Sequence, residues 1–270
     1  MRLLNVHNLL LEEFPAEPPR YAVLSHTWDD GEIQFRDLSE NEQASVRNKK
    51  GYQKIQGVCR MAKERALDWC WVDTCCIDKT SSAELSEAIN SMFKWYQNAE
   101  ICFVYLSDLS VTEAGGQGRQ AKSLSSSRWF SRGWTLQELI APKTVLFYDY
   151  SWEVIGEKCS IPFRTALSTV TGIPELVLTN DEKLQDIAVA QRMSWAAGRK
   201  TTKPEDMAYC LLGIFDVGIP ILYGEGPRAF FRLQEEILKN TTDTSIFAWT
   251  ADGHAEPRGL LAESVNEFLG

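Results

Sequence analysis

Apolar runs and amphipathic stretches alternate along the first 150 residues of the chain. The apolar runs predict four strands, at 21–25, 69–73, 101–106 and 144–148. Apolar residues at three-and-four spacing between these runs predict helices at 52–68, 83–98 and 134–140. The run at 101–106 is apolar throughout, which is typical of a parallel strand covered on both faces. Strands that alternate with helices predict a parallel sheet with right-handed crossovers, so the expected fold class is α/β.

Beyond residue 150 the pattern becomes mainly helical. It predicts helices at 161–170, 183–197, 205–215 and 227–239, followed by a short strand at 245–249. The Gly-, Ser- and Gln-rich stretch at 110–127 predicts a flexible surface loop. We therefore expect an α/β core at 1–158 and a helical extension at 159–270 packed on it, together one compact unit.

Composition narrows the class of protein. The 270 residues are 44% hydrophobic and 24% charged, which is enough apolar material for a soluble core. A net charge of −9 argues against nucleic-acid or membrane-surface binding, so an anionic ligand needs local Arg or Lys side chains. No apolar run reaches the roughly 18 residues of a membrane span, and the first residues do not resemble a signal peptide.

The seven cysteines lack paired Cys-x-x-Cys spacing, and several lie in apolar runs. This pattern predicts buried, reduced thiols and a cytoplasmic location. Three separated histidines without paired cysteines argue against zinc, so no metal is expected. Cys75 or Cys76 with His26 and an aspartate would form a thiol nucleophile, whereas inert buried thiols are the competing interpretation.

Polar residues follow three of the predicted strands. They are Ser25, His26, Thr27, Trp28, Asp29 and Asp30, then Asp73, Thr74, Cys75, Cys76 and Asp78, then Ser107 and Asp108. Because ligands of open parallel sheets bind at the carboxyl ends of the strands, we expect these groups to converge. Ser25 and His26 are candidate ligand contacts, and Asp73 is either a site acid or the cap of a turn.

Glu138 stands four residues after Trp134, with Arg128 and Arg132 upstream. Two interpretations are open. Thr135-x-x-Glu138 is a capping-box pattern, worth about 0.5–2 kcal/mol to a helix. Alternatively, Glu138 stabilises an oxocarbenium-like sugar while a base departs, and Trp134 or Trp28 stacks on that base.

Two further motifs lie in the helical part. Glu205 and Asp206 begin a predicted helix, where acidic side chains favour the helix dipole. Tyr223-Gly-Glu-Gly-Pro227 predicts a tight turn before a helix and lacks the pattern of a phosphate-binding P-loop. A structural role is the expectation for both.

Several segments, in order, resemble the fungal heterokaryon-incompatibility (HET) domain family. They are Tyr21-Ala-Val-Leu-Ser-His-Thr-Trp28, Trp71-Val-Asp-Thr-Cys-Cys-Ile-Asp78, Glu87-Ala-Ile-Asn-Ser-Met-Phe-Lys-Trp-Tyr96, Arg132-Gly-Trp-Thr-Leu-Gln-Glu-Leu139, Glu205-Asp-Met-Ala-Tyr-Cys-Leu-Leu-Gly-Ile-Phe215 and Tyr223-Gly-Glu-Gly226. The resemblance implies a cytoplasmic cell-death effector. It also implies a place N-terminal to nucleotide-binding and repeat-sensor modules in a larger fungal NOD-like receptor.

A more distant resemblance is to TIR domains. Val23-Leu-Ser25, the helix around Ala88-Ile89 and Trp134-Thr-Leu-Gln-Glu-Leu139 carry it. It implies a flavodoxin-type sheet and cleavage of NAD by a glutamate, which by position is Glu138. Thr135 replaces the usual cysteine, the loop before this helix is longer, and the C-terminal helices have no TIR counterpart.

The resulting hypothesis is an NAD glycohydrolase that acts when it self-associates as a homo-oligomer. Glu138 is the catalytic residue, NAD is the substrate, and no cofactor is required. The expected NAD contacts are Ser25, His26, Trp28, Asp73, Trp134 and Arg128 or Arg132, of which the arginines meet the diphosphate. The alternative is a non-catalytic oligomerisation or adaptor module that recruits partners, with Glu138 acting only as a cap.

Overall fold

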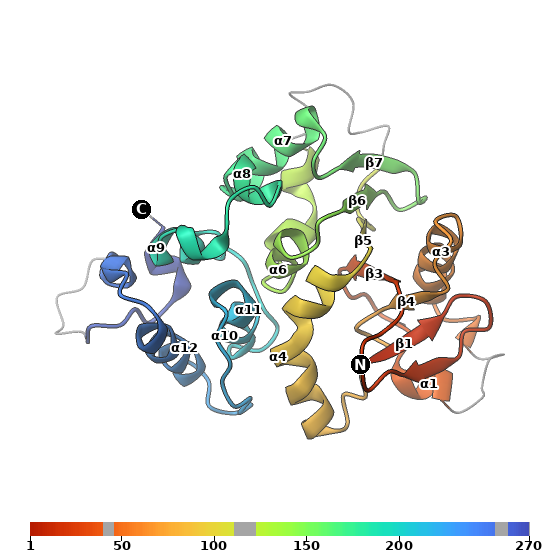
Figure 1. Cartoon of the computed structure of the whole chain (residues 1–270), viewed down its shortest axis with the longest axis horizontal. Helices are drawn as coiled ribbons and strands as arrows, with labels where there is room; N and C mark the ends of the chain where they lie inside the picture. The colour runs from red at the N-terminus through yellow and green to blue at the C-terminus, as the bar shows by residue number, and fades with distance from the viewer. Residues whose placement is uncertain (40–45, 111–122, 252–258, 270) are drawn as a thin grey trace.

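A computed structural model of the chain describes residues 1–39, 46–110, 123–251 and 259–269. A mixed sheet forms the centre of the N-terminal half (Figure 1). Its strands are β1 (Arg2–Asn5), β2 (Leu11–Glu13), β3 (Tyr21–His26), β4 (Trp69–Trp71), β5 (Ile101–Tyr105), β6 (Val145–Tyr148) and β7 (Val154–Glu157). They are arranged in the order β2-β1-β4-β3-β5-β6-β7.

The four central strands, β4, β3, β5 and β6, are parallel, as the sequence predicts. In chain order they are the second, first, third and fourth parallel strands, which is the flavodoxin-type order. Ala22 of β3 pairs with Cys70 on one side and with Ile101 on the other. The strand order therefore reverses between β3 and β5, and a ligand site is expected at that point.

Three antiparallel edge strands were not predicted. β1 and β2 form a hairpin on one edge, and β7 pairs with β6 on the other. These strands have only three or four residues each, and β2 and β7 are not fully buried. Such short segments give no clear two-residue alternation, so the sequence pattern alone does not distinguish them from loops.

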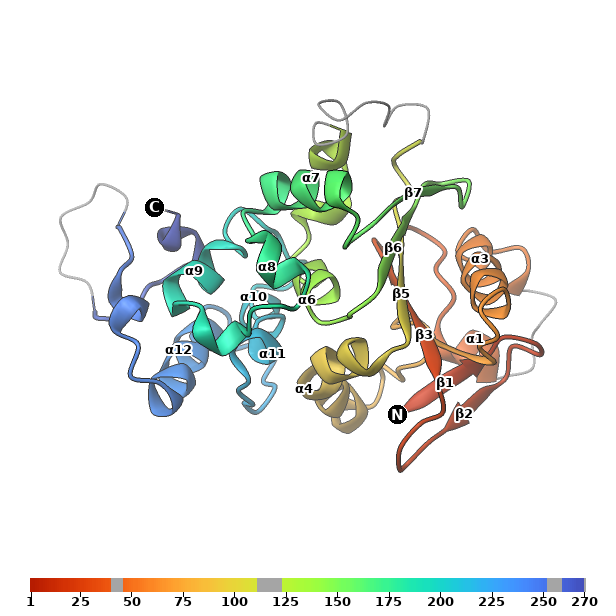
Figure 2. The same cartoon turned by 45° about the horizontal axis from the view of Figure 1, so that its top comes forward.

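Helices cover both faces of the sheet (Figure 2). α1 (Phe35–Ser39) and α3 (Tyr52–Lys63) lie on one face, and α4 (Ser82–Asn98) and α6 (Thr135–Ile140) lie on the other. α4 buries Ala88, Ile89, Met92 and Tyr96, the face that its sequence periodicity predicts. Most of the predicted loop at 110–127 lies outside the described residues, since 111–122 are not among them.

In the helical extension, α7 (Ile161–Thr171) packs beside β7, with Phe163 against Phe147 of β6, and the later helices lie beyond α4 and α6 (Figure 2). The later α-helices are α8 (Glu175–Leu178), α9 (Val189–Ser194), α10 (Asp206–Tyr209), α11 (Leu212–Phe215) and α12 (Arg228–Asn240). Its 3-10 helices are η2 (Leu184–Asp186), η3 (Thr244–Phe247) and η4 (Val265–Phe268). None of the described helices is both long and apolar enough to cross a membrane.

Three predictions for the extension need correction. The helix predicted at 183–197 is split, because Ile187 and Ala188 have extended backbones between η2 and α9. The helix predicted at 205–215 is likewise divided into α10 and α11. The strand predicted at 245–249 is wrong: the segment forms η3, which begins where the Asp243 side chain accepts a hydrogen bond from the Ser245 backbone.

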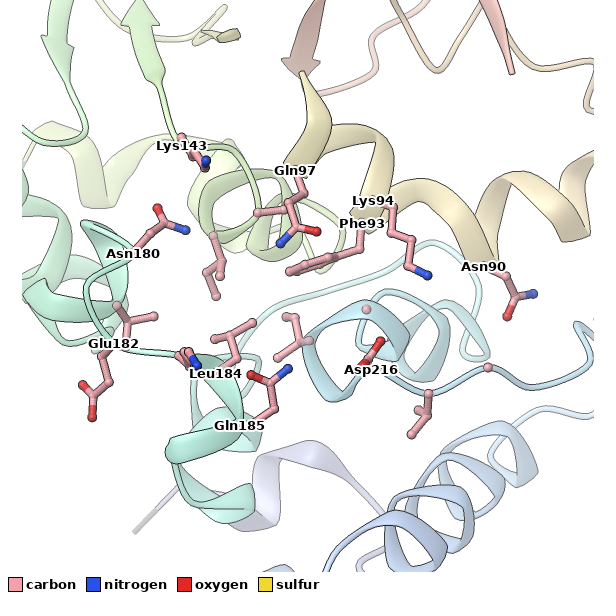
Figure 3. Close-up of a pocket in the computed structure, with 18 residues that line it drawn as sticks. Asn90, Phe93, Lys94, Gln97, Lys143, Asn180, Glu182, Leu184, Gln185 and Asp216 are labelled. Carbon is pink, nitrogen blue, oxygen red and sulfur yellow. The ribbon is translucent and has the colours of Figure 1, made fainter. Parts of the chain in front are cut away.

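The extension contacts the core where α11 packs against α4. Phe93 points from α4 toward α11, which Figure 3 also shows. A Cβ atom added to Gly213 would lie 2.0 Å from the Phe93 Cβ atom, so this contact requires glycine.

We predict that Gly213→Ala lowers the free energy of unfolding by about 1–3 kcal/mol through overpacking. Alanine is more favourable than glycine in a helix by roughly 1 kcal/mol, so without overpacking the Gly213→Ala variant would be more stable than wild type. A loss of stability therefore indicates the close contact with Phe93. Gly218→Ala is the control, because its Cβ would be 3.4 Å from the nearest atom, and it should change stability by less than about 0.5 kcal/mol. Urea unfolding measures both values, and equal stability of the two variants would contradict the packing of α11 on α4.

Candidate functional site

Glu138 lies where the strand order reverses. Its carboxyl group accepts a hydrogen bond from the Ser25 hydroxyl, at the carboxyl end of β3. The Ser25 oxygen in turn accepts a 2.8 Å hydrogen bond from the Trp129 indole, in η1 (Arg128–Ser131). Two regions distant in sequence, the end of β3 and the η1–α6 segment, therefore meet at the Glu138 side chain, and Glu138 is only 7% exposed.

The capping-box interpretation of Glu138 is wrong. Thr135 is already helical, and the N-cap position belongs to Trp134, which makes no side-chain capping bond. The Thr135 hydroxyl lies 2.6 Å from the carbonyl oxygen of Trp129, so it donates backward to η1. The Glu138 side chain forms a hydrogen bond with Ser25 of β3 and does not cap the N-terminus of α6.

Burial dominates the acidity of Glu138. It raises the pKa of this carboxyl to about 8, against an ordinary value of 4.5. The hydrogen bond from Ser25 opposes this rise, the negative charge of Asp73 adds to it, and Tyr96 and Arg132 oppose it. At neutral pH the group is therefore mostly protonated, and it becomes a buried anion in mildly alkaline solution.

His26 lies between two carboxylates. Its side chain is 1% exposed, with Nε2 3.3 Å from Asp73 Oδ1 and Nδ1 3.7 Å from Glu32 Oε1. Asp73 also accepts a 2.9 Å hydrogen bond from the Trp28 indole. Burial alone would raise the pKa of Asp73, but His26 and the positive charge of Lys79 bring it below its ordinary value. Asp73 is thus an anion near Glu138.

Lys54, from α3, neutralises part of this acidic cluster. Its ammonium group donates to the Thr27 carbonyl at 2.9 Å, to Asp29 at 3.0 Å and to Glu32. Lys54 was not among the predicted site residues, because it lies in a helix that was expected only to pack against the sheet.

Arg128 joins the polar groups that follow β3 and β5. It donates to Asp29 Oδ1 at 2.8 Å and lies 3.6 Å from Asp108. A diphosphate would have to replace these carboxylates to bind Arg128. The Arg132 side chain is half-buried, makes no hydrogen bond to the described residues, and acts on Glu138 through its positive charge.

The two candidate tryptophans have different surroundings. Trp28 is 48% exposed, and the Lys79 ammonium lies 3.6 Å from the centroid of its ring. Trp134 is half-buried and hydrogen-bonds to Asp206 of the extension, so it contributes to the junction with α10. Trp28 lines a pocket.

Two pockets border the polar cluster. One of about 520 Å³ is lined by Trp28, Glu32, Thr74 and Lys79, among others. The other, of about 380 Å³, is lined by Asp29, Lys54, Tyr105 and Ser107, among others. Glu138 lines neither pocket. A third pocket, of about 720 Å³, lies between α4, α11 and η2 and holds none of the predicted site residues (Figure 3).

The cysteines do not form a nucleophilic site. Cys75 and Cys76 are buried, and the hydrogen bond between them together with burial holds the pKa of Cys75 well above its ordinary value. A thiol in that environment is protonated and unreactive. All seven cysteines are free, and six are buried. Within the described ranges, no group of three or more His, Cys, Asp or Glu side chains is arranged to hold a metal ion.

The extension motifs have structural contacts. The Glu205 carboxylate accepts backbone hydrogen bonds from Gly224 at 2.8 Å and from Gly226 at 2.9 Å. Both glycines have positive φ angles, of +102° and +60°, which the turn requires. Glu205 therefore fixes the Tyr223–Gly226 turn at the start of α12.

Tyr96 and Trp129 are site residues that the sequence did not reveal. Both are aromatic positions in apolar patterns. Trp129 donates a hydrogen bond to Ser25, and the Tyr96 hydroxyl donates to the Leu24 carbonyl at 3.2 Å and also hydrogen-bonds with the Glu138 carboxyl group. A buried tyrosine or tryptophan needs a partner for its polar atom. The sequence does not show which partner that is.

The protein is therefore of the α/β class, with the buried Glu138 carboxyl group at the point where the strand order of its open sheet reverses. Residues 21–121 match the family model described as Heterokaryon incompatibility protein (HET), and residues 228–267 match Domain of unknown function (DUF8212). The chain is also 46% identical, over 257 residues, to Vegetative incompatibility protein HET-E-1 of Podospora anserina. These matches confirm the resemblance to the HET domain family that the motifs indicated, with the HET domain model matched at residues 21–121.

This alignment covers 91% of the chain but only 18% of the relative. The chain therefore spans less than a fifth of the relative's length. No solved structure matches the chain.

The raised pKa of Glu138 predicts how stability varies with pH. The folded state holds a proton between about pH 4.5 and 8 that the unfolded state releases, so this group makes the protein less stable as pH rises through that window. Glu138→Gln imitates the protonated form and removes the effect. We expect the free energy of unfolding of the variant, relative to wild type, to increase by on the order of 3 kcal/mol from pH 5 to pH 8.

Urea titrations of both proteins at the two pH values measure this difference. Glu100→Gln is the control, because Glu100 is exposed at the amino end of β5, and its difference from wild type should vary little over the same range. A constant difference for Glu138→Gln would show that Glu138 is ionised already at pH 5.

Proposed function

We propose that this HET domain is a cell-death effector of vegetative, or heterokaryon, incompatibility, and that it hydrolyses the nicotinamide–ribose bond of NAD. The observation that carries the enzymatic part is the buried Glu138 carboxyl group, held by Ser25 at the switch point of the sheet. The name of the 46% identical relative supports the biological part. The proposed mechanism uses side chains of the chain and water, and it requires neither a metal ion nor an organic cofactor.

The reaction begins when the bond between the ribose C1′ and the nicotinamide nitrogen breaks. The bonding electron pair leaves with nicotinamide, which becomes neutral, and positive charge develops on the ribose ring. The Glu138 carboxylate stabilises that charge, and its effect is large because the surroundings exclude water. Water then attacks C1′ and loses a proton, and the products are nicotinamide and ADP-ribose.

The Trp28 pocket is the proposed binding site for the rest of the dinucleotide. Its exposed tryptophan face offers a stacking surface for a base, and Lys79 beside it carries positive charge. Ser25, His26 and Asp73 do not line this pocket in the present conformation; in this proposal they contact the ligand once Glu138 becomes accessible, and Trp134 supports the helix that carries Glu138. Arg128 or Arg132 meets the diphosphate; for Arg128 this requires release of Asp29.

Burial of Glu138 explains why activation requires a structural change. A carboxyl group that lines neither bordering pocket does not reach a ribose in this conformation. We propose that association into a homo-oligomer opens the path. The signal comes from nucleotide-binding and repeat-sensor modules that follow the domain in a larger receptor of the cytoplasm. The relative, of which the chain covers 18%, has room for such modules.

The same burial favours a second candidate function, a non-catalytic adaptor that signals through assembly. In that case Glu138 is a structural acid whose proton stabilises the core. The two functions differ in what Glu138→Gln does, because glutamine keeps the hydrogen bond with Ser25 but carries no charge.

We predict that Glu138→Gln lowers the rate of NAD cleavage at least ~100-fold, which corresponds to about 2.7 kcal/mol of lost transition-state stabilisation. The measurement is chromatography of nicotinamide and ADP-ribose after incubation of artificially clustered protein with NAD. Glu100→Gln, at the opposite end of the parallel strands, is expected to retain full activity. A folded Glu138→Gln protein that still consumes NAD and kills cells would contradict the catalytic role; wild-type killing without NAD loss would establish the adaptor.

A second prediction concerns pH. Because the ionised form of Glu138 is the active one and its pKa is about 8, kcat/KM should rise about tenfold per pH unit below pH 8 and level off above it. Initial rates between pH 5.5 and 9.5 measure the profile, with a pH-stable fluorescent NAD analogue as substrate. A rate that is flat from pH 6 to 9 would show that the carboxylate is ionised throughout or has no part in catalysis.

A further inference from the structure

The helix that carries Glu138 depends on groups outside the sheet. α6 has six residues, and an isolated helix of that length is not stable in water. Its beginning is held by Arg199 and its end by Lys158, both of which are buried cations. Lys158 donates to the carbonyl groups of Leu139 at 3.4 Å and Pro142 at 2.5 Å, where a cation stabilises the end of a helix.

Arg199 comes from the extension, between α9 and α10, and is 6% exposed. Its guanidinium donates to the Arg132 carbonyl at 3.0 Å and to the Thr135 hydroxyl at 3.1 Å, and to Trp195 within the extension at 3.0 Å. Arg132 lies just before α6 and Thr135 is its first residue, so two of the three hydrogen bonds hold the beginning of that helix. Within the described residues, no carboxylate forms an ion pair with Arg199.

The backbone beside Arg199 pairs with the same segment. The Lys200 amide donates to the Ser131 carbonyl at 2.7 Å, and the Gly133 amide donates to the Lys200 carbonyl at 2.9 Å. A Cβ atom on Gly133 would lie 2.6 Å from the Thr201 side chain. Glycine is therefore required before α6 because the extension approaches so closely.

Arg199 and Glu138 also interact through their charges. Burial lowers the pKa of Arg199 to about 10, so it remains positive at neutral pH, and the negative charge of Glu138 opposes that lowering. A buried cation without an ion-pair partner favours a nearby anion. Ionised Glu138 supplies that anion.

We propose that Arg199 is a positioning residue of the Glu138 site: supplied by the helical extension, it fixes the beginning of α6, the helix that carries Glu138. The consequence for catalysis rests on the proposed function, whereas the structural role does not. The extension is then part of the site and not only a cover for the core.

The test compares Arg199→Gln and Arg199→Lys in the full chain with Arg192→Gln. Arg192 is a matched control, because it is also a buried arginine of the extension, but it donates to the Ile214 carbonyl at 3.1 Å and lies over the Phe215 ring. Two measurements do not need activity. They are the ¹³C NMR titration of the Glu138 carboxyl group, assigned with Glu138→Gln, and hydrogen exchange of the α6 amides.

In Arg199→Gln we expect the Glu138 titration to move up by roughly one pH unit and the α6 amides to exchange about tenfold faster. Arg199→Lys keeps the charge but loses the guanidinium fork, so the titration should stay within about half a unit of wild type while exchange is still faster. Arg192→Gln should change neither value. If NAD is cleaved, the pH profile of Arg199→Gln should shift upward with the titration.

A folded Arg199→Gln protein with unchanged titration and exchange would overturn the proposal, as would equal effects from Arg192→Gln. If Arg199→Gln does not fold, the exchange of Arg199→Lys decides: wild-type protection of α6 would overturn the proposal. If wild-type protein does not cleave NAD, the proposed function fails, while the titration and exchange still decide the role of Arg199.

Discussion

The Glu138 carboxyl group is buried in the gap where the strand order of the sheet reverses, and its hydrogen bonds hold the surrounding segments in place. An isolated carboxylate buried in this way would be strongly destabilised. Glu138 therefore keeps its proton at neutral pH and accepts a hydrogen bond from the Ser25 hydroxyl. Ser25 is oriented in turn by Trp129, and Tyr96 contributes from α4. The end of β3, η1, α4 and α6 must all be correctly placed to satisfy this one group.

The charged residues around this centre are largely paired with one another. His26 lies between Asp73 and Glu32, and Lys54 and Arg128 neutralise Asp29. The protein is acidic overall, so these cations are the local means of attracting an anionic ligand. A ligand with two phosphates would compete with carboxylates for Arg128.

The sequence allowed the parallel centre of the fold to be predicted, because four continuous apolar runs alternate with amphipathic helical segments. It did not reveal the edge strands or the division of the helix predicted at 183–197, which depend on pairing and on the conformation of two residues. Among the candidate site residues, Ser25 was selected by its place at the end of a strand, and Glu138 by its tryptophan and arginine neighbours and by the resemblance to TIR domains. Trp129 and Tyr96 were not, because their polar atoms have partners that only the three-dimensional arrangement defines. The capping box failed for a similar reason: tertiary contacts of Thr135 replaced the local pattern.

Burial creates opposite requirements at Glu138. A dry environment makes the carboxylate effective against a developing positive charge, yet the same environment keeps substrate away. Any movement that exposes Glu138 must also move α6, and the beginning of α6 is bonded to Arg199 and Lys200 of the extension. The extension and the helix must therefore move together, or those hydrogen bonds must break. If Glu138 acts as proposed, the position of the extension therefore bears on access to Glu138, because Arg199 and Lys200 tie the start of its helix to the extension.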